Sequence, residues 1–231
     1  SGMPRPTQTS SPEASPVDSV PNRYMAFGDS ITCIPACDPE VPPPWAPYPV
    51  RLESRLDIHV RPSEVGNFGL SGELTYQQPD KGGLNRIDDA VNGYQPRYVL
   101  IMEGTNDVTV HRDPGEVYGY LDQMIYNARH AWVENVYPML ATLTPRLDGL
   151  NDETQTMNVD AIIAVTTDKD IPLCRQYKAF EDYGNYPELY VDDVHPNSEG
   201  LQLMSDTWYD CILTTFTDVY EDVTPPTPTL N

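Results

Sequence analysis

The sequence has few basic residues. Its 231 residues include 14 lysines and arginines against 35 aspartates and glutamates, which gives a formal net charge of −21 at pH 7. So negative a chain repels the phosphates of nucleic acids and anionic membrane surfaces at long range. The charge therefore argues against nucleic acid as a partner and is explained most simply as solvation of the surface.

Long hydrophobic runs are also missing. No stretch approaches the roughly 18 to 20 apolar residues of a membrane helix, and no signal-peptide core precedes the first expected strand. Ser1 and Gly2 ahead of Met3 look like a cloning remnant, so the missing signal does not argue against export. We expect no integral membrane segment, and the oligomeric state stays open.

Two kinds of cofactor site lack their sequence signatures. Cys33-x-x-x-Cys37 has no second Cys/His pair at ligand spacing, which argues against a zinc site. The chain also lacks a glycine-rich phosphate fingerprint. We therefore expect neither a metal nor a cofactor.

The four cysteines form an even set, which allows three pairings into two disulfides. We favour Cys33–Cys37, which would close a small loop, and Cys174–Cys211, which would tie a late strand to the last helix. Four buried free thiols are the alternative. Because disulfides form in oxidising compartments, these pairings predict a secreted, extracellular protein.

Proline, serine and threonine gather at both ends of the chain, where hydrophobic periodicity is absent. Residues 1–21 are expected to be a cloning remnant and a mobile linker, and residues 223–231 a second linker or tail. Between them we expect a single domain over residues 22–222, since one α/β domain commonly reaches this length. The two ends suit either a module of a longer extracellular protein or frayed termini.

Between the ends, short apolar runs alternate with helical patterns. This indicates an α/β protein whose parallel sheet is covered by helices on both faces. The expected strands are Tyr24–Phe27, Ile58–Val60 with an optional extension towards Asn67, Tyr98–Met102, Pro138–Leu143 and Ile171–Leu173. Apolar spacing predicts helices over residues 115–129 and 201–211, the second capped by Asn197 or Ser198.

Four short motifs carry possible chemistry, and each has an ordinary alternative. The first is Gly28-Asp29-Ser30 at the end of the first strand, the place where parallel α/β sheets bind their ligands. A glycine before the serine lets the backbone turn sharply. The alternative is a turn capped by the Asp-Ser pair.

The second and third motifs contain hydrogen-bond donors. Residues 67–72 (Asn-Phe-Gly-Leu-Ser-Gly) form a glycine-containing loop that can expose a backbone N–H, and Gly104-Thr105-Asn106-Asp107 places an amide side chain after a strand. Donors of both kinds can stabilise an oxyanion. Ordinary turns are the alternative for both motifs.

The fourth motif is Asp192-Asp193-Val194-His195, shortly before the last helix. With two residues between them on a loop, the Asp192 carboxylate and the His195 imidazole can turn towards each other, so that the carboxylate sets the imidazole tautomer. Asp193 is the rival for this role, and a surface Asp-x-x-His is common by chance. The conjunction of all four motifs in this order is informative because a single mechanism needs all of them.

These blocks resemble those of the SGNH/GDSL hydrolase superfamily, and the resemblance spans the chain from Tyr24 to about Phe216. It implies a three-layer α/β/α sandwich with a flavodoxin-like parallel sheet of about five strands. It also implies that Ser30 is the nucleophile, that His195 is the general base and acid, and that Asp192 orients His195.

The same resemblance assigns the oxyanion hole to the backbone N–H groups of Ser30 and Gly69 and to the side chain of Asn106. The other aspartates of the motifs are expected to have structural roles: Asp29, Asp107 and Asp193.

Two aromatic residues are candidates for substrate binding. Trp45 ends the proline-rich stretch that follows the nucleophile, and its ring could pack against an acyl or sugar group. Tyr190 leads into the loop of Asp192 and His195 and could form the opposite wall. Packing against the protein itself is the alternative for both.

The complete set predicts a carboxylic ester hydrolase that cleaves short-chain, acetyl-type esters through an acyl-enzyme intermediate. Its substrate would be a small-molecule or polysaccharide ester. The alternatives within the superfamily are a carbohydrate acetyl esterase and a lipase or lysophospholipase. The non-enzymatic alternatives are an inactive relative that serves as a binding module and a cofactor-binding flavodoxin-like protein.

Overall fold

A computed structural model describes residues 15–37, 45–59, 62–78 and 82–216. The strands are β1 (Val17–Asp18), β2 (Val20–Gly28), β3 (Glu64–Gly69), β4 (Pro96–Met102), β5 (Val133–Glu134), β6 (Tyr137–Ala141) and β7 (Leu173–Cys174). The helices are α1 (Ser30–Cys33), α2 (Tyr48–His59), α3 (Gly83–Tyr94), α4 (Thr105–Thr109), α5 (Pro114–Arg129), α6 (Asn151–Met157), the π-helical turn η1 (Asn158–Ile163), α7 (Ala164–Lys169), α8 (Gln176–Tyr183), the 3-10 turn η2 (Tyr186–Leu189) and α9 (Ser198–Thr215).

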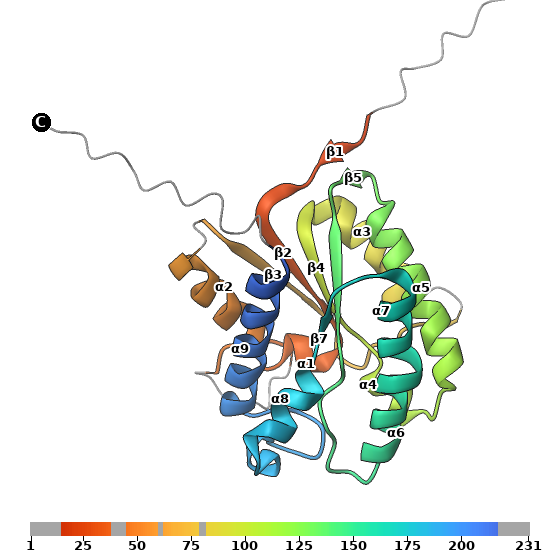
Figure 1. Cartoon of the computed structure of the whole chain (residues 1–231), viewed down its shortest axis with the longest axis vertical. Helices are drawn as coiled ribbons and strands as arrows, with labels where there is room; N and C mark the ends of the chain where they lie inside the picture. The colour runs from red at the N-terminus through yellow and green to blue at the C-terminus, as the bar shows by residue number, and fades with distance from the viewer. Residues whose placement is uncertain (1–14, 38–44, 60–61, 79–81, 217–231) are drawn as a thin grey trace, which may run out of the picture.

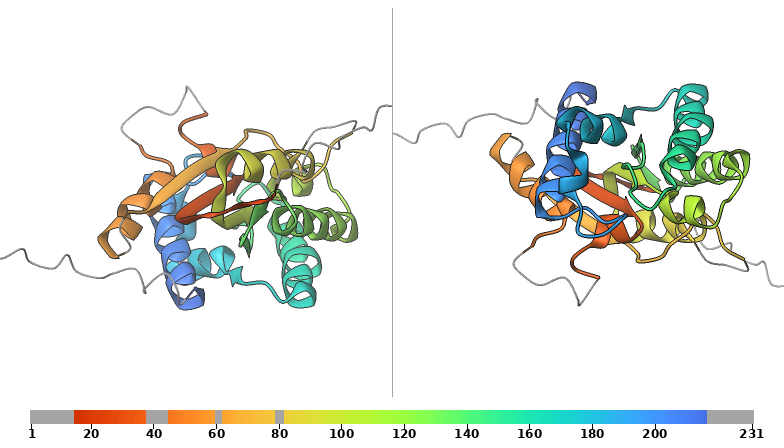
Figure 2. Two further views of the ribbon diagram at one scale, coloured as in Figure 1. Left: turned by 90° about the horizontal axis from the view of Figure 1, so that it is seen from above. Right: turned by 90° about the horizontal axis from the view of Figure 1, so that it is seen from below.

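Five of the strands form one parallel sheet in the order β3-β2-β4-β6-β7. Helices α2, α8 and α9 cover one face, and α3, α5, α6 and α7 cover the other (Figures 1 and 2). The molecule is therefore a three-layer α/β/α sandwich, and its strand order is that of flavodoxin-like folds. This confirms the expected fold class.

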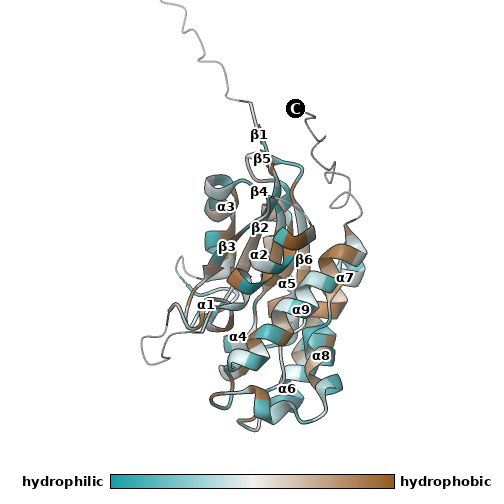
Figure 3. Ribbon diagram, turned by 90° about the vertical axis from the view of Figure 1, so that its left-hand side faces the viewer, coloured by the Kyte–Doolittle hydropathy of each residue, from teal (hydrophilic) through white to brown (hydrophobic). Residues whose placement is uncertain are grey.

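The central strands are hydrophobic along their whole buried length. Every residue from Tyr24 to Phe27 in β2 and from Val99 to Met102 in β4 is fully buried. Such uninterrupted runs are typical of parallel strands that have helices on both faces. The helices themselves alternate between hydrophobic and hydrophilic stretches, as amphipathic helices packed on a sheet do (Figure 3).

Strand β2 is the point at which the strand order reverses, because the chain continues to β3 on one side of it and then crosses to β4 on the other. Gly28, the last residue of β2, pairs with Gly69 of β3 and with Met102 of β4. Ligand sites of open α/β sheets lie at the carboxyl ends of the strands at such a switch point. The register thus brings the ends of these three strands to one level.

The second expected strand was misplaced. Ile58 lies in helix α2 with 65% of its surface exposed, and the strand β3 begins only at Glu64. The helix extends to His59 because Tyr48, Leu52 and Leu56 recur every four residues and are buried along one side of it. Val60 lies outside the described residues.

Other strand limits also moved. The strand β6 spans Tyr137–Ala141, so it ends two residues earlier than the expected Leu143. The strand β7 is only the pair Leu173–Cys174, whereas the expected strand began at Ile171. In the expected linker, residues 17–18 form β1, which pairs in parallel with β5, and β2 already begins at Val20. Residues 1–14 of that linker, and the expected tail 223–231, lie outside the described residues.

The helix and disulfide predictions are confirmed. Helix α5 covers residues 114–129, and the side chain of Asn197 caps α9 by accepting the N–H groups of Glu199 and Gly200. The disulfides are Cys33–Cys37 and Cys174–Cys211. Within the described residues, no helix has the length and apolar character that crossing a membrane requires.

Candidate active site

Ser30 is the first residue of helix α1, two residues beyond the end of β2. The turn between them depends on Gly28, because a Cβ atom there would lie 2.3 Å from Thr32 Oγ1 and 2.6 Å from the Met102 carbonyl oxygen. Only glycine allows strand and helix to approach so closely. This turn places the Ser30 hydroxyl at the carboxyl edge of the sheet.

Asp29 holds the same turn from inside. One oxygen of its carboxyl group accepts the Ile31 N–H at 2.9 Å, which caps α1, and the side chain also interacts with Thr105. Burial raises the pKa of Asp29 to about 6, and these hydrogen bonds oppose the rise only in part. Asp29 is therefore a buried structural residue, as the sequence suggested.

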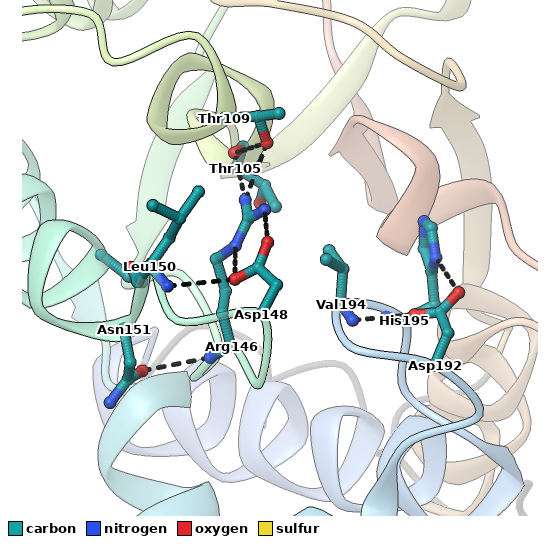
Figure 4. A network of polar contacts seen from close by, with 10 residues as sticks. Thr105, Thr109, Arg146, Asp148, Leu150, Asn151, Asp192, Val194 and His195 are labelled. Carbon is teal, nitrogen blue, oxygen red and sulfur yellow. Dashed lines mark hydrogen bonds and ion pairs between the residues drawn. The ribbon is translucent and has the colours of Figure 1, made fainter.

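Ser30, His195 and Asp192 form a continuous chain of hydrogen bonds. His195 Nε2 lies 2.9 Å from Ser30 Oγ, and His195 Nδ1 lies 2.8 Å from Asp192 Oδ2. Asp192 Oδ1 accepts the backbone N–H groups of Val194 and His195 at 2.8 and 2.7 Å (Figure 4). The carboxylate therefore receives the Nδ1 proton, and the lone pair of Nε2 faces the serine.

The charge of Asp192 is stabilised in this position. Partial burial raises its pKa, but the hydrogen bonds from the amide and imidazole of His195 and from the Val194 amide outweigh burial and hold the pKa below its usual value. Asp192 is thus ionised at neutral pH beside the imidazole.

The loop that carries Asp192 and His195 is closed by backbone pairing. Tyr190 and Pro196 form an isolated antiparallel bridge, and the Val191 N–H donates to the His195 carbonyl oxygen at 3.0 Å. Helix α9 begins directly afterwards at its cap, Asn197. The sequence predicted this transition, which fixes where His195 emerges.

The two aromatic candidates lie in different surroundings. The Tyr190 hydroxyl donates to the Pro145 carbonyl oxygen at 2.6 Å, and its ring packs on Phe180 at 5.7 Å between centroids. These contacts anchor the start of the Asp192–His195 loop to the rest of the protein. Trp45 is half-buried and follows residues 38–44, which lie outside the described residues. A substrate contact by either residue stays a prediction.

Asn106 lies in the short helix α4, immediately after β4. Its Nδ2 donates to the Glu73 carbonyl oxygen at 2.7 Å. The neighbouring Asp107 accepts the N–H and the hydroxyl of Thr75 at 2.8 and 2.7 Å and is paired with Arg112. The third motif is thereby held against the loop that follows β3.

Gly69 has a structural task in this arrangement. Its N–H donates to Asn67 Oδ1 at 3.0 Å. A Cβ atom at this position would lie 2.4 Å from the Cys33 nitrogen and 2.9 Å from the Asp29 carbonyl oxygen, so glycine is needed where β3 meets α1. Gly69 is thus the last residue of β3, whereas the sequence motif placed it in a loop.

Gly72 was not singled out from the sequence. It has a φ of 74° in a turn that closes when the Glu73 N–H donates to the Leu70 carbonyl oxygen at 3.1 Å. A residue with positive φ at this position is characteristic of a type II turn, which favours glycine. No hydrogen bond from the Gly72 N–H to another described residue is found. The dipeptide Ser71-Gly72 is typical of turns and could have indicated this glycine from the sequence.

Arg146 was also missed. Its guanidinium is almost fully buried and donates to the Thr105 carbonyl oxygen at 2.8 Å and to Thr109 Oγ1 at 3.0 Å, and it pairs with Asp148 (Figure 4). The same loop bonds the His195 loop, because the Leu147 N–H donates to the Asp193 carbonyl oxygen at 2.8 Å. Arg146 thus fixes the start of α4, one residue before Asn106, and nothing in its local sequence distinguishes it from a surface arginine.

The model of the GDSL-like lipase/acylhydrolase family matches residues 26–203. None of the curated protein sequences that were compared matches the chain significantly.

Several solved structures share the fold. A lipase/acylhydrolase from Enterococcus faecalis is 25% identical with a TM-score of 0.66, and the match covers 83% of this chain and 95% of the other. A member of the lipolytic G-D-S-L family from Veillonella parvula is 23% identical with a TM-score of 0.62, covering 84% and 98%. A carbohydrate acetylesterase from Sinorhizobium meliloti is 15% identical with a TM-score of 0.67, covering 84% and 100%.

Proposed function

The chain belongs to the GDSL-like lipase/acylhydrolase family, and from this premise we propose that it cleaves short-chain acyl esters at Ser30 through an acyl-enzyme intermediate. As a member of this family the protein is a carboxylic ester hydrolase. The observation that carries the proposal is the uninterrupted chain of hydrogen bonds from Ser30 through His195 to Asp192.

In the first half of the reaction His195 Nε2 takes the proton of Ser30 as Oγ attacks the ester carbonyl. The imidazolium that forms is stabilised by Asp192. When the tetrahedral intermediate collapses, the alcohol leaves with the proton from His195 and the acyl group stays on Ser30. In the second half, His195 activates a water molecule, and the same steps release the acid and restore the serine.

The oxyanion needs donors that are already in place. We assign the Ser30 N–H and Asn106 Nδ2, which retains a second hydrogen beyond its bond to Glu73. For the third donor we propose the Gly72 N–H in place of Gly69, because the Gly69 N–H is already engaged by Asn67 Oδ1. Gly72 precedes the residue whose carbonyl holds Asn106, so the two donors belong to one bonded unit.

A short acyl group with a larger alcohol suits the exposure of this site. The side chain of His195 is 26% exposed and that of Asp192 is 52% exposed, so the reacting groups lie close to solvent. A polysaccharide acetyl ester is therefore the second candidate substrate, and the fold shared with a carbohydrate acetylesterase is consistent with it. The two disulfides support a secreted location.

The first test is the Ser30→Ala variant assayed with p-nitrophenyl acetate and butyrate. Activity should disappear, and a serine-directed organophosphonate should label the wild type at Ser30 alone. Ser54→Ala is the control, because Ser54 lies on the exposed side of α2 and bonds only its own helix. Hydrolysis by Ser30→Ala, or labelling elsewhere, would refute the mechanism.

A second assay separates the substrates. Esters of two to twelve carbons and acetylated xylan are compared at equal enzyme concentration. We expect activity to fall beyond about four carbons, whereas a rise with chain length would indicate a lipase. If none of the esters were hydrolysed, the inactive binding module would be favoured.

A further inference from the structure

A buried glutamate lies near Glu73, whose carbonyl oxygen accepts the Asn106 side chain of the proposed oxyanion hole. Glu103 directly follows β4, three residues before Asn106, and only 1% of its surface is exposed. Neither oxygen of its carboxyl group has a hydrogen-bond partner among the described residues. An ionised carboxylate in such a position is strongly disfavoured, so a neutral carboxylic acid is expected there.

Four titratable side chains from different parts of the chain lie near Glu103. They are Asp29 before α1, Glu73 after β3, Arg86 on α3 and Tyr48 on α2. Among the described residues no three such groups converge on a position where a metal would bind. The only positive charge among them is the Arg86 guanidinium, which acts on Glu103 and is bonded to Glu73.

Arg86 is already committed to one of the three. Its Nε donates to Glu73 Oε1 at 3.0 Å and its Nη2 bonds Glu73 Oε2, while the guanidinium lies 4.0 Å above the Phe27 ring. This is a two-point, charge-assisted pairing of a guanidinium with a carboxylate. Asp29 has the Ile31 N–H, so Glu103 is the carboxyl group that no donor stabilises.

Among these carboxyl groups, Glu103 is the one expected to bind a proton. Burial raises the pKa of Glu103 well above its usual value, and the charges of Asp29 and Glu73 raise it further, while the Arg86 guanidinium opposes the rise. Two ionised carboxylates are both acceptors and cannot bond each other. A proton on Glu103 turns its hydroxyl into a donor to the Glu73 carboxylate.

Glu73 is the residue that orients Asn106. Its carbonyl oxygen accepts Asn106 Nδ2 at 2.7 Å, and its N–H closes the turn that contains Gly72. We propose that Glu103, as a neutral acid, is a positioning residue of the oxyanion hole: its hydroxyl holds the Glu73 carboxylate together with Arg86, and the fixed Glu73 backbone orients the Asn106 amide. The proposal rests on the oxyanion role proposed above for Asn106.

The test compares two substitutions of Glu103 that remove its charge. Glu103→Gln keeps a donor for Glu73 and should leave kcat for p-nitrophenyl acetate within about threefold of the wild type. Glu103→Leu keeps the bulk but removes the donor and should lower kcat at least tenfold, with KM changed less than threefold. Gln176→Leu, at a buried polar position beside α9, is the repacking control and should leave kcat unchanged.

A double-mutant cycle identifies the route of the effect. If Glu103 acts through Asn106, adding Glu103→Leu to Asn106→Ala should cause no further loss of kcat. Independent, multiplied losses would overturn the proposal, and so would equal kcat values for Glu103→Leu and the wild type. Should Glu103→Leu fail to fold, Glu103→Met takes its place in the cycle.

An independent readout does not use activity. The side-chain NH₂ resonances of Asn106, assigned by their loss in Asn106→Ala, should shift in Glu103→Leu and keep their wild-type positions in Glu103→Gln. Unshifted resonances in Glu103→Leu would refute the positioning role even if Ser30 catalyses as proposed. If Ser30→Ala were active while these resonances shifted as expected, the proposed function would fail and the positioning contact would stand.

Discussion

At the scale of single residues, two neighbouring aspartates compete for one role. Asp192 contacts the His195 imidazole and accepts two backbone N–H groups, whereas Asp193 is bonded to the loop of Arg146 through its backbone carbonyl. The spacing of the motif favoured Asp192, and the structure places its carboxylate against Nδ1. The difference between the two residues can be measured directly.

We predict that Asp192→Asn lowers kcat by about 10³- to 10⁴-fold, because an amide can donate to Nδ1 and so favours the wrong imidazole tautomer. Asp193→Asn is the matched control and should change kcat less than twofold. Steady-state kinetics on p-nitrophenyl acetate measure both. A larger loss in Asp193→Asn than in Asp192→Asn would reverse the assignment.

Asp29 has a pH-dependent effect on stability. Its pKa is about 6 in the folded chain and 3.8 as an isolated group, so the folded state binds the proton more tightly. Its contribution to stability is therefore complete below pH 3.8 and is lost as the pH rises through 6.

Asp29→Asn keeps an acceptor for the Ile31 N–H but carries no charge. We compare the free energy of unfolding of the variant with that of the wild type at each pH. The difference, variant minus wild type, should be larger at pH 8 than at pH 4 by about 2 to 3 kcal/mol. Urea denaturation at the two pH values measures this difference. An equal effect of the substitution at both values would contradict the buried, protonated form.

At the scale of elements, the two disulfides join different kinds of segments. Cys174–Cys211 ties β7 to α9 across 37 residues, and α9 begins three residues after His195. Cys33–Cys37 closes a loop of sequence separation four at the end of α1, beside Ser30. The first bridge crosses between distant parts of the chain, and the second acts locally.

Loop-closure entropy predicts unequal costs when these bridges are removed. Replacing Cys174 and Cys211 by alanine should lower the free energy of unfolding by about 4 kcal/mol, and replacing Cys33 and Cys37 by about 2 kcal/mol. Chemical denaturation of the two double variants measures this. A greater loss of stability without Cys33–Cys37 would show that loop length does not govern the effect.

The elements also show where sequence patterns misled. Ile58 and Val60 are β-branched residues in alternation, which favours a strand, but the burial of Leu52 and Leu56 on one side extends the helix through Ile58. Likewise β7 is two residues long because only Leu173 and Cys174 pair with β6. Local preference yields here to the pattern of packing.

At the scale of the whole molecule, the charge of −21 dominates the long-range electrostatics. Most acidic side chains have no basic partner available, since acids outnumber bases by 35 to 14. Mutual repulsion among them destabilises the compact state, and salt screens it over distances that shrink from about 30 Å at 10 mM to about 3 Å at 1 M.

We therefore predict that the Tm at pH 8 rises by several degrees when sodium chloride is raised from 10 mM to 1 M. Near the sequence pI of about 4.2 the same change in salt should have little effect, which makes that pH the control. Differential scanning calorimetry measures both. A Tm that is unchanged or lower at pH 8 in high salt would contradict the role of repulsion.

The sequence by itself determined the parallel α/β class, the turn at Ser30, the Asp192–His195 spacing and the cap of α9, because each depends on neighbouring residues or on a short period. Only the tertiary structure decided that Gly69 lies against Cys33, that Arg146 supports α4, and that Glu103 is buried beside Glu73. Those facts depend on contacts between segments that are 30 or more residues apart in the sequence. Side-chain type alone carries no information about such contacts.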